Sequence, residues 1–114
     1  MRRIFMLPIS ATFLTALAYA DEWTGKLVDA NCTNPVGGVH ACDPGPTTTN
    51  FGLVVAGTAY LFDSKGNRKA AEAIKHRAET ADNDHPAVFP VNATIDGKKA
   101  GKTILVDKLV IDTQ

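Results

Sequence analysis

The chain is short of cysteine, aromatic residues and net charge. It has two cysteines, one tryptophan and two tyrosines among 114 residues, and its 12 basic residues balance its 12 acidic ones. Without Arg2 and Arg3, the residues after position 20 carry a formal charge of −2. A nonspecific nucleic-acid binder needs many Lys and Arg residues to displace counterions, so the composition argues against nucleic acid as a partner. It also argues against a polybasic membrane-surface protein.

The first 20 residues have the layout of a secretory signal peptide. Two arginines precede an apolar run from Ile4 to Ala18, and small residues at positions 18 and 20 flank Tyr19. The run is about 15 residues long, shorter than the roughly 20 that a membrane-spanning helix needs. We therefore expect cleavage between Ala20 and Asp21, a single small domain over residues 21–114, and a secreted or periplasmic location without stable membrane insertion.

The two cysteines, Cys32 and Cys42, lie ten positions apart in the exported part of the chain. In a small exported domain this pattern indicates one disulfide. The alternative is a metal-binding or thiol-redox protein that uses Cys32, His40 and Cys42, with Asp29 or Asp43 as a fourth ligand, because thiolate and imidazole suit zinc and copper(I). The oxidising compartment favours the disulfide, so no metal or other cofactor is expected.

No catalytic constellation is present. The chain has no G-x-S-x-G, H-E-x-x-H or phosphate-binding glycine motif. A nucleophilic cysteine beside His40 would need a reduced thiol of low pKa, and a second cysteine ten residues away in an exported protein argues against one. We therefore expect a protein that is not an enzyme.

Hydrophobic periodicity predicts five strands and one helix in the order β-β-β-α-β-β. The expected strands span residues 23–31, 51–56, 59–63, 87–95 and 103–111. Asn67 is the expected helix cap, and apolar residues then recur at three- and four-residue spacing as far as Ala81. This order fits a mainly β fold, a five-stranded Greek-key barrel of the OB type. An open α+β sandwich with the helix on one face is the alternative.

The last two strands carry a further expectation. Asp96-Gly97 is expected to begin a turn, followed by a lysine-rich loop over 98–102. Apolar residues occupy both parities of 103–111, so this strand is expected to be buried on both faces or to change face near Asp107-Lys108.

Three lysines, Lys98, Lys99 and Lys102, are the candidate binding residues. In an OB-type barrel the loops that follow strands 1 and 4 flank the binding cleft, so the lysines would lie beside the disulfide loop. There they would face a polyanion or an acidic glycan. The simpler interpretation is a solvated hairpin tip, where Lys and Gly suit a turn.

The segment 23–32, Trp-Thr-Gly-Lys-Leu-Val-Asp-Ala-Asn-Cys, resembles the W-T-G-x-(I or L)-x-D-x-x-C opening of an uncharacterised family of small secreted bacterial proteins. The later places of that pattern are filled here by His40, Cys42, Tyr60, Asp96-Gly97 and residues 103–111. The resemblance implies export, a small barrel-like domain and no established activity. The expected function is a noncatalytic exported domain that binds or structures a partner, itself not identified, through its loops.

The leader generates the first testable prediction. N-terminal sequencing of the exported protein is expected to begin at Asp21, because the small residues at positions 18 and 20 suit signal peptidase. A protein that stays in the cell and keeps Met1 would contradict this expectation.

Overall fold

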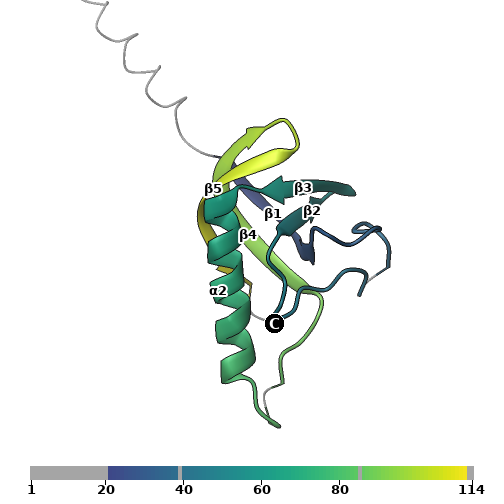
Figure 1. The fold of residues 1–114 in the computed structure, drawn as a ribbon, viewed down its shortest axis with the longest axis vertical. Coiled ribbons are helices and arrows are strands. Elements are labelled where there is room, and N and C mark those ends of the chain that lie inside the picture. Colours follow the sequence, from purple (N-terminus) through teal and green to yellow (C-terminus); the bar gives the residue numbers. More distant parts are fainter. Residues whose placement is uncertain (1–20, 39, 85, 113–114) are drawn as a thin grey trace, which may run out of the picture.

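The computed structural model describes residues 21–112 except 39 and 85, so the predicted leader and Ala20 lie outside the described residues. The described part contains the predicted order of elements (Figure 1). They are β1 (Asp21–Asp29), β2 (Phe51–Val55), β3 (Thr58–Phe62), α2 (Ser64–Thr80), β4 (Val91–Ala100) and β5 (Thr103–Ile111). No helix among the described residues is long and apolar enough to cross a membrane.

The five strands form a closed barrel in the order β1-β2-β3-β5-β4, with β1 pairing with β4 to complete it. Among the strand pairs of the described residues, only β3–β5 is parallel. Closure confirms the OB-like barrel and excludes the open sandwich. Gly25 lets β1 run close to β2 while it pairs with β4, because a Cβ at this position would lie 2.1 Å from the Val54 carbonyl oxygen.

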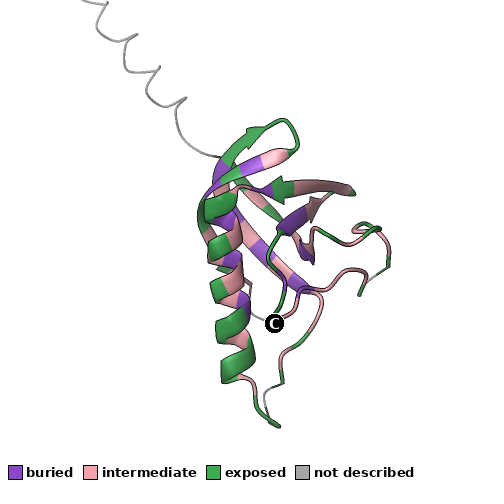
Figure 2. Ribbon diagram, in the orientation of Figure 1, coloured by how far each residue is buried: buried purple, intermediate pink, exposed green. Residues whose placement is uncertain are grey.

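One apolar core fills the barrel and extends to the helix (Figure 2). Helix α2 packs mainly against β5 and contributes Ala70 and Ile74, both buried. The remaining core side chains come from the strands, and they are Leu27, Phe51, Leu53, Phe62, Val91, Ala93, Ile95, Ile104 and Val106.

Strand β5 changes face midway, as one of its two sequence interpretations required. Ile104 and Val106 are buried, but beyond them Leu109 and Ile111 are the residues that pack against the core. The register of the β4–β5 pair shifts at this point. Gly97 of β4 pairs with Val106, but Asp96 pairs with Lys108, so Asp107 is an extra residue in β5. Such a bulge reverses the facing of all later residues.

The helix begins earlier than expected, and Asn67 is not its cap. Asp63 is the N-cap, with extended φ and ψ of −77° and 177°, and its carboxylate accepts a hydrogen bond from the Gly66 backbone N–H at 2.9 Å. Asn67 lies one turn inside the helix, where its side-chain oxygen accepts from the Phe51 backbone N–H at 2.8 Å. Asn67 therefore joins α2 to the start of β2 instead of capping the helix.

The expected turn at Asp96-Gly97 is also wrong. Strand β4 continues through both residues to Ala100, and the turn falls at Gly101-Lys102. Gly97 is needed for close approach between strands, because a Cβ there would lie 2.4 Å from the Leu105 carbonyl oxygen. The strand expected at 87–95 also begins later than predicted, at Val91. Because it continues to Ala100, Lys98 and Lys99 belong to β4.

The Asp63 carboxylate generates a prediction of stability. Oδ1 also accepts from the Val106 backbone N–H at 3.2 Å, so Asp63→Ala removes the cap and leaves a partly buried N–H of β5 without its partner. We expect the free energy of unfolding to fall by about 2–4 kcal/mol. Chemical denaturation measures it, and Ser64→Ala at the exposed neighbouring position is the control. Equal effects of the two substitutions would show that Asp63 does not join α2 to β5.

Candidate functional site

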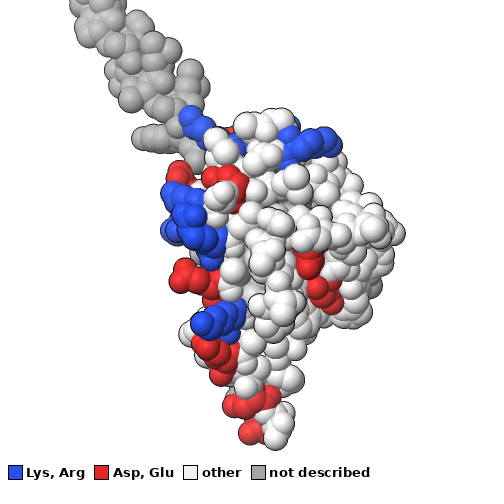
Figure 3. Space-filling model, viewed as in Figure 1, with Lys and Arg blue, Asp and Glu red and all other residues white. Residues whose placement is uncertain are grey.

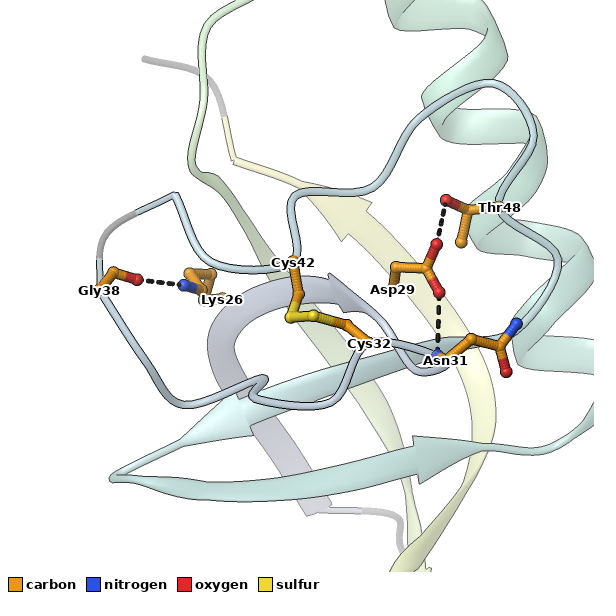
Figure 4. Close-up of a disulfide and its surroundings, with 7 residues drawn as sticks. All are labelled: Lys26, Asp29, Asn31, Cys32, Gly38, Cys42 and Thr48. Atoms are coloured by element: carbon orange, nitrogen blue, oxygen red, sulfur yellow. Dashed lines mark hydrogen bonds between the residues drawn. A yellow bond between two sulfur atoms is a disulfide. The ribbon is translucent and has the colours of Figure 1, made fainter.

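A disulfide joins Cys32 and Cys42, as the sequence predicted, and their Cα atoms are 5.6 Å apart. It closes the first part of the disulfide loop, which we define as residues 30–50 between β1 and β2 (Figure 4). The bridge pins a segment whose prolines and glycines prevent regular structure. A short closed loop of this kind loses less chain entropy on folding.

Asp29, at the end of β1, anchors the disulfide loop. Its backbone N–H donates to the Cys42 carbonyl at 2.9 Å. Its carboxylate accepts from the Asn31 backbone N–H at 2.9 Å and from the Thr48 hydroxyl at 3.0 Å (Figure 4). Thr48 is buried, and its hydroxyl also accepts from the Gly45 N–H at 3.0 Å. Asp29 therefore orders both halves of the loop.

The metal-binding alternative does not assemble in this arrangement. The two sulfur atoms are bonded to each other, and therefore neither is a thiolate ligand. His40 Nδ1 lies 3.2 Å from Asp43 Oδ2, and Asp29 is committed to the loop. Within residues 21–112, leaving aside 39 and 85, no three His, Cys, Asp or Glu side chains are placed to hold a metal ion.

The three candidate lysines lie on the β4–β5 hairpin, which we call the lysine hairpin. Lys99 pairs with the buried Ile104, so its side chain starts on the interior face of the sheet and extends past the end of the core. Lys98 pairs with Leu105, which is 46% exposed, and therefore faces outward. The structure brings Lys99 and Lys102 together and places Lys98 on the other face of the same hairpin.

Lys99 and Lys102 meet at the ring of Tyr60 from β3. Their Nζ atoms lie 5.5 Å and 6.0 Å from the ring centroid. Tyr60 contacts Trp23 of β1, with ring centroids 5.8 Å apart and ring planes tilted by 48°. The Trp23 indole N–H donates to the Gly97 carbonyl at 3.3 Å. Two half-buried aromatic rings thus close one end of the barrel beneath two ammonium groups.

Trp23 and Tyr60 both pack against the core. Sequence reasoning missed that the Tyr60 ring also meets Lys99 and Lys102. The available signal was parity: Lys99 lies two residues after Gly97 and four after Ile95, both of which are buried. Once β4 is extended beyond Gly97, this parity places Lys99 on the interior face.

The lysine hairpin and the disulfide loop do not share one rim, contrary to the sequence expectation. β1 and β4 are antiparallel, with Leu27 opposite Val91 and Asp21 opposite Gly97. The disulfide loop therefore follows β1 at the end of the barrel where β4 begins. The turn of the lysine hairpin instead follows the end of β4. Figure 1 shows the β2–β3 hairpin between the two. The disulfide loop instead folds back on β1, where Lys26 Nζ donates to the Gly38 carbonyl at 3.0 Å.

Comparisons with family models, curated proteins and solved structures found no match to this chain. The functional argument therefore depends on the chain's own residues.

The disulfide generates a second prediction of stability. Cys32→Ala combined with Cys42→Ala is expected to lower the free energy of unfolding by about 2–4 kcal/mol, because the unfolded chain regains the entropy of the open loop. Thermal unfolding with and without a reductant measures the effect. The reductant should destabilise the natural protein and leave the double variant unchanged. If the reductant does not change the melting temperature of the natural protein, the bridge does not stabilise the fold.

Proposed function

We propose that this protein is an exported, noncatalytic binding domain that takes an acidic glycan or a similar polyanion on the lysine hairpin. We further propose that it belongs to the uncharacterised family of small secreted proteins whose opening motif it resembles. The observation that carries the binding proposal is the convergence of Lys99 and Lys102 on the Tyr60 ring. Lys98 adds a third ammonium group on the outer face of the hairpin.

The arrangement suits a ligand with repeated negative charge. A lysine ammonium is a compact, mobile point charge, so it attracts carboxylate or sulfate groups without demanding one geometry. An exposed cation–π contact contributes only about 0.5–1 kcal/mol, which positions the lysines without trapping them. When a ligand draws the ammonium groups outward, the face of Tyr60 is free to pack against a sugar ring.

Basic side chains gather in two places on the face drawn in Figure 3. The domain carries a slight negative formal charge, yet basic side chains lie at the hairpin end of the molecule (Figure 3). A second basic group covers the first half of α2, which contains Lys65, Arg68 and Lys69, and acidic and basic side chains alternate further along the helix (Figure 3). For a long polyanion, a group of like charges adds up, whereas alternating charges largely cancel.

The disulfide supports export, because it fits an oxidising compartment. The bridge also favours binding over the metal alternative, because it occupies both sulfur atoms.

The test is binding of the exported protein to dextran sulfate and to polygalacturonate, with uncharged dextran as the ligand control. Substitution of Lys98, Lys99 and Lys102 together by Gln is expected to weaken binding tenfold or more, equivalent to about 1.4 kcal/mol. Binding by the natural protein should also weaken as salt rises, because salt screens exposed charges. Isothermal titration calorimetry measures both effects.

The matched control replaces three cations of α2, Arg68, Lys69 and Lys75, by Gln. It removes the same formal charge from another surface, and binding should change less than twofold. If the two triple variants lose equal affinity for the polyanion, net charge alone explains the effect and the proposal is overturned. Binding that survives the hairpin substitutions, or no binding of either polyanion at low salt, would overturn it as well.

A further inference from the structure

A pocket of about 660 Å³ lies between the second half of α2, residues 86–88 and the end of β5. Its walls are largely apolar, and the apolar contributions come from Ala73, Ala81, Pro86, Ala87, Val88 and Ile111. Pockets of roughly 300–1,000 Å³ with apolar walls and few polar groups are typical of small-molecule sites. This pocket lies toward the end of α2 away from the lysine hairpin, so it is independent of the proposed polyanion site (Figure 1).

Arg77 supplies the positive charge of the pocket lining, which also contains the Asp112 carboxylate, and gives the pocket part of its shape. Its guanidinium donates to the Val88 carbonyl and lies 5.2 Å from the centroid of the Phe89 ring. These contacts hold the segment after the helix against α2. A guanidinium has five N–H donors, so the bond to Val88 leaves donors for a ligand. His76, one residue earlier, also lines the pocket.

Two other polar side chains of the lining, Thr80 and Asp112, are engaged within the fold. The Thr80 hydroxyl donates to the carbonyls of His76 and Arg77, at 3.0 Å and 3.3 Å. The Asp112 carboxylate accepts from the Thr94 hydroxyl at 3.2 Å. Arg77 is therefore the group that can offer several charge-assisted hydrogen bonds to an incoming ligand.

We propose that this pocket binds a small amphipathic carboxylate, a medium-chain fatty acid or a molecule of the same chemistry. The carboxylate pairs with the Arg77 guanidinium, and the alkyl chain lies on the alanines, Val88 and Ile111. Burial of the alkyl chain away from water supplies the affinity. The arginine supplies the preference for an acid over an alcohol of the same length.

The test titrates the isotope-labelled exported protein with three probes that share one alkyl chain: decanoate, decanol and decylammonium. NMR chemical-shift changes from decanoate should map to the second half of α2, to residues 86–88 and to the end of β5. Decanol should bind at the same place about tenfold more weakly, and decylammonium more weakly still. Decanoate shifts that map elsewhere, or an equal or tighter affinity for decylammonium, would overturn the proposal.

Variants of Arg77 separate its charge from its packing. Arg77→Gln is expected to weaken decanoate binding about tenfold, the value of one charge-assisted hydrogen bond, and to weaken decanol binding much less, so that the preference for decanoate is lost. Arg68→Gln, at an exposed position of the same helix, is the matched control and should change neither. If Arg77→Gln lowers the melting temperature, Arg77→Lys keeps the charge and should retain the preference for decanoate over decanol.

Ala73→Leu tests the cavity itself. The added side chain fills part of the pocket and should weaken decanoate and decanol alike. If Arg77→Gln and Ala73→Leu both bind decanoate as tightly as the natural protein does, the pocket is not the site.

Discussion

The Asp63 carboxylate is the contact on which the joining of helix and barrel depends. One oxygen accepts from the first turn of α2 and from the Val106 N–H of β5, and the Asp63 backbone N–H donates to Ile104 of the same strand. Gly66 lets the two elements meet closely, because a Cβ there would lie 2.5 Å from Val106 Cγ2. The end of β3, the start of α2 and the middle of β5 are thereby held together. That junction sets the parallel β3–β5 pairing that the closed barrel requires.

Much of the fold could be predicted from the sequence, because hydrophobic periodicity and turn residues act locally. The order of elements followed from such signals, and that order fitted the barrel better than the open sandwich. The change of face in β5 was one of two alternatives that the apolar pattern left open, and the disulfide followed from the two cysteines of a chain expected to be exported. The errors arose where a residue's role depends on a distant partner. Asn67 has the chemistry of a cap but bonds to β2, and Gly97 has the chemistry of a turn but allows close approach to β5. The positions of Lys98, Lys99 and Lys102 relative to the disulfide loop depended on strand register, which composition does not reveal.

The two proposed sites use different properties of one small barrel. At the lysine hairpin, an inward-facing lysine emerges beyond the core and meets an aromatic ring that closes the barrel. At the C-terminal end of α2, a gap between the helix, residues 86–88 and the end of β5 leaves an apolar pocket bordered by Arg77. Neither pattern is visible as a sequence motif, because each joins residues from several elements. The disulfide loop is a third region, and its internal hydrogen bonds indicate a structural role.

The pairing of β1 with β4 has a consequence for the order in which the chain can fold. Thr24 and Thr94 face each other across that pair although they are 70 positions apart. β5, which pairs with both β3 and β4, comes later still. A chain that emerges from its N-terminus therefore exposes its first strand long before either closing strand is present. Pairings at such long sequence separation form slowly, since the entropy of loop closure opposes them. The topology therefore delays closure of the barrel until nearly the whole chain is available.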